Sequence, residues 1–137
     1  MWWIYALLSA FFAALTAVFA KVGIRGVDTD LATAIRTVVI LIIAWGIAFI
    51  RGGTTTMHTL TKLNILFLCL SGIATGLSWI FYFKALQLGK VSQVAPVDKI
   101  SVAIAIILSA IFLKETLDLK TIIGALLIIG GTMVLIW

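Results

Sequence analysis

The chain has 137 residues, of which 64% are hydrophobic and 11% are charged, and its formal net charge is +5 at pH 7. Soluble domains carry roughly 45–50% apolar and about 25% charged residues, so this composition excludes a soluble globular protein. The Lys and Arg residues flank the apolar segments and do not form one basic face. This distribution favours lipid head groups over nucleic acid as the partner.

Five apolar segments are long enough to cross a bilayer, at about 1.5 Å of rise per residue against a hydrocarbon core of about 30 Å. The sequence therefore predicts an all-α integral membrane protein with five transmembrane helices. We expect one membrane domain over residues 1–137, with helices at about 3–22, 31–50, 63–83, 91–113 and 119–137.

The second predicted helix carries the first embedded charge. Asp30 is a plausible N-cap for this helix, because its carboxylate can accept free backbone N–H groups. Arg36 follows about one and a half turns inside, where it either extends to the head groups or faces inward. His58, in the polar segment 54–62, has no second metal-ligating side chain near it, so we predict no metal site.

One face of the third predicted helix is polar. Its members fall at spacings of three, four and seven residues and therefore share a side of the helix: Ser71, Thr75, Ser78, Trp79 and Tyr82. Two interpretations stay open. The hydroxyls bond back to carbonyls one turn earlier while the aromatic rings fill space, or the face lines a cavity.

The fourth predicted helix places Pro96, Asp98 and Lys99 inside a membrane span. Charged side chains raise the free energy of insertion there, so they mark functional candidates. Asp98 and Lys99 point about 100° apart on a helix, and we expect each to have its own partner; Asp98 shares its face with Ser101. Pro96 frees the Ser92 carbonyl. The alternative role for Asp98 and Lys99 is structural, with Asp98 paired to Arg36 or Lys99 bound to a backbone carbonyl.

The basic residues at the span ends do not favour either orientation. Loops on the side of the N-terminus and loops on the opposite side hold four each: Arg51, Lys62, Lys114 and Lys120 against Lys21, Arg25, Lys84 and Lys90. Cytoplasmic loops normally hold the excess. The tie predicts insertion in both orientations and an antiparallel homodimer, unless one fixed orientation is set by features that this count does not resolve.

The segment from Phe83 to Glu115, with Ala85-Leu86-Gln87-Leu88-Gly89-Lys90 running into Val94-Ala95-Pro96-Val97-Asp98-Lys99, resembles the EamA domain of the drug/metabolite transporter superfamily. Most members have two such domains in one chain, arranged as inverted repeats, and move small metabolites. The resemblance implies a single repeat completed by an antiparallel partner, with the first four helices lining a cavity.

The sequence thus predicts a secondary transporter of small metabolites, amino-acid-like or organic anion or zwitterion, in the plasma membrane of a prokaryote. The binding residues we expect are Asp98, Lys99, Pro96, Trp79, Tyr82, Ser101 and Arg36. No set of nucleophile, base and orienting group is present, so we predict no catalytic residue, no enzyme and no cofactor. The partners are the bilayer, a second copy, the substrate and a coupling proton or cation. The alternative function is an accessory membrane subunit that transports nothing.

Overall fold

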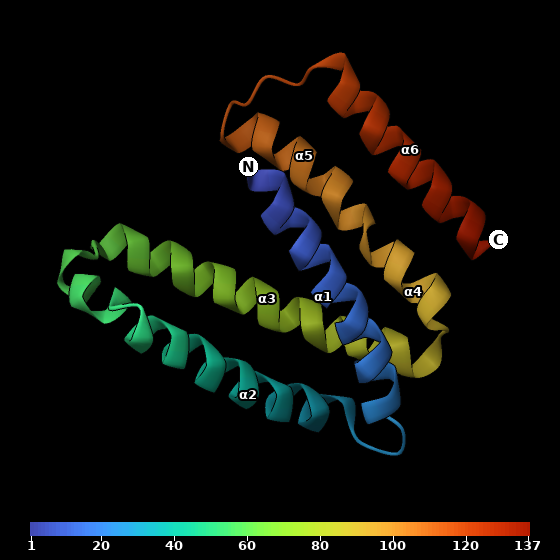
Figure 1. The fold of residues 1–137 in the computed structure, drawn as a ribbon. Helices are drawn as coiled ribbons and strands as arrows, with labels where there is room; N and C mark the ends of the chain where they lie inside the picture. The colour runs from blue at the N-terminus through green and yellow to red at the C-terminus, as the bar shows by residue number, and fades with distance from the viewer. The chain divides into compact units, whose positions relative to one another are not determined.

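The computed structural model describes all residues, Met1–Trp137, and its regular structure is entirely helical (Figure 1). The elements in chain order are α1 (Trp2–Gly23), α2 (Thr29–Ile50), the 3₁₀ helix η1 (Gly53–Thr59), α3 (Lys62–Leu88), α4 (Val91–Asp98), α5 (Ile100–Phe112) and α6 (Leu119–Ile136). This architecture confirms the predicted all-α fold.

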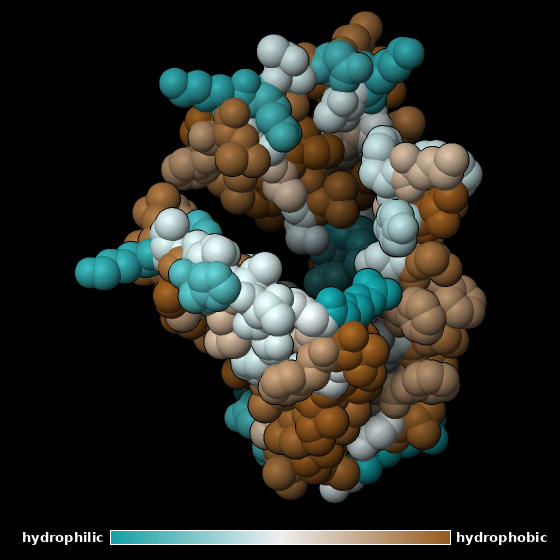
Figure 2. Space-filling model, turned by 60° about the vertical axis from the view of Figure 1, so that its left-hand side comes forward, coloured by the Kyte–Doolittle hydropathy of each residue, from teal (hydrophilic) through white to brown (hydrophobic).

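Five helical stretches are long and apolar enough to cross a membrane: Trp2–Gly23, Thr29–Ile50, Lys62–Leu88, Val91–Phe112 and Leu119–Ile136. Their large apolar side chains point outward, as Phe12 (62% exposed) and Leu127 (70% exposed) illustrate. Figure 2 shows hydrophobic side chains, in brown, over most of the visible helical surface. A surface of this kind is stable against lipid tails and not against water.

The chain forms two compact units, Phe19–Gln87 and the combination of Met1–Val18 with Leu88–Trp137. In the unit Phe19–Gln87, two hydrogen bonds join the end of α3 to the end of α1 and to the α1–α2 connection. The Lys21 Nζ donates to the Leu86 carbonyl, and the Gln87 amide donates to the Val27 carbonyl at 3.2 Å. Leu86 and Ile24 are buried there. In the second unit α6 packs against both α4 and α5.

The predicted N-cap of α2 is wrong by two residues. Asp28, in extended conformation, accepts from the backbone N–H groups of Asp30 and Leu31 at 3.0 Å, and the helix begins at Thr29. A carboxylate two or three positions before a free N–H reaches it, whereas Asp30 already lies in the first turn. Gly52, at φ +71°, ends the helix region in the left-handed conformation that glycine adopts without strain.

Three other boundaries also differ from expectation. Residues Gly53–Thr59 form a 3₁₀ helix where a polar loop was predicted, because hydroxyls of Thr55, Thr56 and Thr59 bond to carbonyls three residues earlier. The third span continues beyond Phe83 to Leu88, since Ala, Leu and Gln after Lys84 favour helix. The fourth span is interrupted at Lys99.

Candidate functional site

The interruption between α4 and α5 is a short stretch of tightened backbone. Lys99, at φ −72° and ψ −8°, donates its N–H to the Pro96 carbonyl at 3.0 Å, and its own carbonyl accepts from Val102 N–H at 3.0 Å. Both bonds span three residues, as in a 3₁₀ turn. Pro96 has no N–H to give to the turn before it, which weakens the helix in the segment leading to this point.

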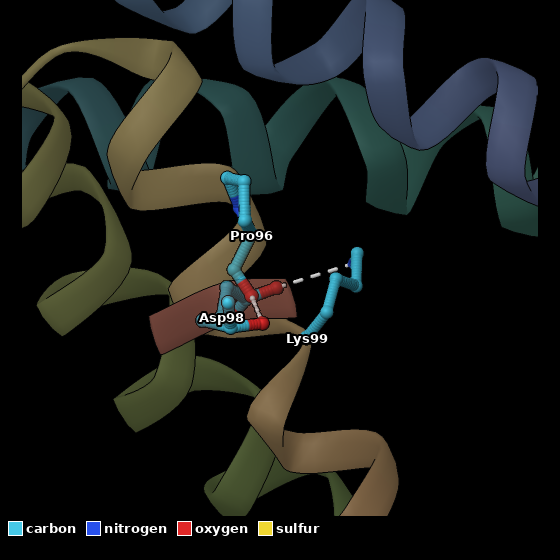
Figure 3. A network of polar contacts seen from close by, with 4 residues as sticks. Pro96, Asp98 and Lys99 are labelled. Carbon is cyan, nitrogen blue, oxygen red and sulfur yellow. Dashed lines mark hydrogen bonds and ion pairs between the residues drawn. The ribbon is translucent and has the colours of Figure 1, made fainter. Parts of the chain in front are cut away.

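Asp98 and Lys99 form an ion pair at the break, with Lys99 Nζ 3.3 Å from Asp98 Oδ2 (Figure 3). The expectation that these two side chains have separate partners is therefore wrong. The 3₁₀ turn departs from regular α-helical geometry, and the long Lys99 side chain folds back to the carboxylate. The side chains are 34% exposed for Asp98 and 55% exposed for Lys99, so the chain itself does not enclose either charge.

A buried hydroxyl from α6 also contacts the break. Thr132 is 4% exposed, and its Oγ1 lies 3.2 Å from the Pro96 carbonyl and 2.8 Å from the Ile128 carbonyl. Its single hydroxyl hydrogen is shared between these two acceptors. The sequence predicted that Pro96 would free the Ser92 carbonyl, but the carbonyl that a side chain contacts is that of Pro96. Ser101, in α5, is exposed and does not join this group.

A second group lies in the other compact unit, between α2 and α3. The guanidinium carbon of Arg36 is 4.3 Å from the centroid of the Trp79 ring and 4.9 Å from that of Phe83. Both distances fall within the range of cation–π attraction. The ring of Tyr82 follows on the same side, with its centroid 6.1 Å from that of Phe83. Arg36 is half-buried and Phe83 is buried, so the rings hold the guanidinium between α2 and α3.

The structure thus divides the predicted binding residues between two groups. Pro96, Asp98 and Lys99 lie together at the helix break, and Arg36, Trp79 and Tyr82 lie together on α2 and α3. The polar face of α3 follows the first of its two interpretations at one position, where Thr75 Oγ1 donates to the Ser71 carbonyl at 2.8 Å.

Comparison with known proteins identifies the class of molecule to which these groups belong. The profile of the EamA-like transporter family matches residues 1–137. The chain belongs to the EamA-like transporter family. A protein of Sinorhizobium sp named "Uncharacterized transporter in cobO 3'region" is 47% identical over 134 residues, which cover 98% of this chain and 95% of that protein. An uncharacterized protein of Methanocaldococcus jannaschii is 41% identical over 66 residues, 48% of each chain. No solved structure matches the chain.

Membership of the EamA-like family confirms the resemblance stated from the sequence and the prediction that the chain is not an enzyme. It is an integral membrane protein of a transporter family, with five candidate spans. In such a protein, accessible charges within apolar spans are the groups able to recognise a polar solute.

Two residues in these groups were not selected from the sequence. Phe83 was predicted to end the third helix and to begin the EamA-like segment, and its spacing of four from Trp79 was the signal that it shares a face with that ring. Thr132 is one of the few polar residues in the last span. A polar side chain in so apolar a helix was the signal that it contacts another helix.

Proposed function

We propose that this chain is a secondary transporter of small anionic or zwitterionic metabolites, amino-acid-like in their charged groups, in the plasma membrane of a prokaryote. The observation that carries the proposal is the accessible Asp98–Lys99 pair at a break in an otherwise apolar span. A carboxylate and an ammonium side by side match the two charges of a zwitterion, and each can exchange its partner for a solute group of opposite charge. Pro96, Ser101, Trp79, Tyr82 and Arg36 complete the proposed binding residues.

The working form in this proposal is an antiparallel homodimer that alternates access between the two sides of the membrane. The loop basic residues support it, because four flank each side and give no orientation preference. Two oppositely inserted five-helix chains would form the inverted repeat that many transporters carry within one chain. Each chain would act as a single five-helix domain over residues 1–137.

Transport in proteoliposomes tests this function. Purified protein is reconstituted, and uptake of radiolabelled amino acids and dicarboxylates is measured with and without a pH gradient. We expect Asp98→Asn to abolish flux or to remove its dependence on the gradient while the protein still folds. Glu115→Gln, which neutralises an exposed carboxylate outside the helices, is the matched control and should leave flux unchanged.

Unchanged, gradient-dependent flux in Asp98→Asn would assign Asp98 a structural role. An accessory subunit that transports nothing is the competing function. It would be indicated by absence of flux together with copurification of a fixed membrane partner in stoichiometric amount.

A further inference from the structure

Arg36 is a cation without an acidic partner in its compact unit. Phe19–Gln87 contains two carboxylates, Asp28 and Asp30, and neither forms an ion pair with Arg36. Asp28 is engaged at the N-cap of α2. Asp30 precedes Arg36 by six residues, which is about 9 Å along the helix axis. A charge at this depth in an apolar span is costly unless something compensates it.

The aromatic contacts offset only part of the cost of the Arg36 charge, because the rings interact with the face of the guanidinium and not with its N–H donors. Trp79 and Phe83 are four residues apart on α3, so they share one face and meet the guanidinium together. A guanidinium stacked on rings is held by its flat face, while its five N–H donors point outward in its own plane. Arg36 makes no side-chain hydrogen bond to the protein in this unit. Its N–H donors are therefore open to an acceptor from outside the protein.

The neighbouring polar groups of α2 do not compete for that edge. The Thr33 hydroxyl donates to the Thr29 carbonyl at 2.8 Å, and the Thr37 hydroxyl donates to the Thr33 carbonyl at 2.8 Å. Their hydrogens are used within the helix. The guanidinium also interacts electrostatically with Tyr82 on α3, but it makes no hydrogen bond on this stretch of α2. The acceptor that fits its fork is a planar or tetrahedral oxyanion.

We infer that Arg36 binds an oxyanion of the substrate, a carboxylate or phosphate, with Trp79 and Phe83 as positioning residues that hold the guanidinium face and present its N–H edge. The inference rests on the proposed function in taking the oxyanion to belong to a transported solute. It deepens that function by requiring that substrates carry an oxyanion. An anionic lipid head group has the same chemistry, and the experiment separates the two sources.

The experiment uses the full chain with Trp79 as the only tryptophan, the other four being replaced by Phe: Trp2, Trp3, Trp45 and Trp137. Trp79 emission is titrated in detergent with succinate, benzoate and inorganic phosphate, and with succinamide and benzamide as neutral counterparts. We expect at least one oxyanion to shift the emission and neither amide to do so. Arg36→Gln should weaken binding by about ten- to a hundred-fold, the range expected for lost charge-assisted hydrogen bonds.

Two further variants separate charge from shape. Arg36→Lys keeps the charge but lacks the planar fork, and should recover only part of the affinity. Arg51→Gln removes an exposed cation at the end of the same helix and should bind as the parent does. Equal binding by Arg36→Gln, or an absence of any oxyanion-dependent shift in the parent, would overturn the inference.

The lipid arm repeats the measurement in phosphatidylcholine vesicles with and without phosphatidylglycerol. A shift that depends on Arg36 and is produced by phosphatidylglycerol alone would overturn the assignment to a solute. If oxyanion binding depends on Arg36 but proteoliposomes show no flux, the proposed transport function is wrong and the Arg36 binding site is supported. If flux is unchanged in Arg36→Gln, the Arg36 site is wrong and the transport function is supported.

Discussion

At the residue scale, Asp118 shows how a single carboxylate fixes the start of a span. Its Oδ1 accepts from the Thr121 N–H at 3.2 Å and from the Thr121 hydroxyl, and these bonds hold the pKa of the Asp118 carboxyl below its ordinary value. The ionised form therefore stabilises the folded state. That contribution is complete above the ordinary pKa of the unfolded chain and is lost as the pH falls through the lower folded value.

Asp118→Asn tests this dependence, because Asn can still cap the helix but does not titrate there. We expect the melting temperature of the parent to exceed that of Asp118→Asn near neutral pH, and the difference to close in strong acid. Thr121→Val should narrow the same difference, since it removes the hydroxyl that binds the carboxylate. A difference that widens as the pH falls would contradict this account of the cap.

Thr132 is the residue that connects α6 to the helix break. Thr132→Val keeps the shape and removes the hydroxyl, so the Pro96 carbonyl retains only its bond from the Lys99 N–H. We expect a loss of about 1 kcal/mol in unfolding free energy, measured by denaturant titration in mixed micelles. Thr132→Ser is the matched control, because it loses a methyl group but keeps the hydroxyl that contacts the Pro96 carbonyl. Equal stability of Thr132→Val and the parent would show that the hydroxyl contact to Pro96 is dispensable.

The two groups of candidate binding residues were only partly predictable from the sequence. Asp98, Lys99 and Arg36 could be selected from the sequence, because a charged side chain in an apolar span raises the free energy of insertion. Their partners depend on side-chain direction. The pairing of Asp98 with Lys99 follows from a local turn, and the stacking of Arg36 on Phe83 follows from how α2 faces α3. Neither can be obtained from helical periodicity alone.

At the element scale, the spans could be predicted because each is long and continuously apolar. The predicted and observed helices differ at their ends, where individual side chains determine the first and last helical residue. Asp28 caps α2 in preference to Asp30 because it precedes the free N–H groups, and α3 continues past Lys84 because the residues that follow favour helix. The break after Asp98 lies three residues beyond Pro96, whereas the sequence predicted only that Pro96 frees the Ser92 carbonyl.

Pro96→Ala tests whether the break serves transport. The alanine N–H can bond to the Ser92 carbonyl, which favours one continuous helix over Val91–Phe112. We expect a higher melting temperature and lower flux in proteoliposomes. Pro96→Gly is the matched control, because it supplies the same N–H but keeps the backbone flexible, and it should retain more flux than Pro96→Ala. Full flux in a stabilised Pro96→Ala protein would show that the break is not needed.

At the scale of the whole molecule, composition alone establishes a membrane protein, and the family match establishes a transporter family. The antiparallel pair is our proposal, and it is supported by the balance of loop charges, because orientation in the membrane follows the distribution of Lys and Arg. We propose that copies insert in both orientations.

Labelling of one introduced cysteine in intact cells tests this claim most directly. His58→Cys is made together with Cys69→Ser, which places a single thiol in the exposed helix η1 between α2 and α3. A membrane-impermeant maleimide is applied before and after permeabilisation. We expect roughly half of the molecules to react in intact cells and all of them after permeabilisation, as two opposite orientations require. Labelling of all molecules, or of none, before permeabilisation would show one fixed orientation and contradict the antiparallel pair.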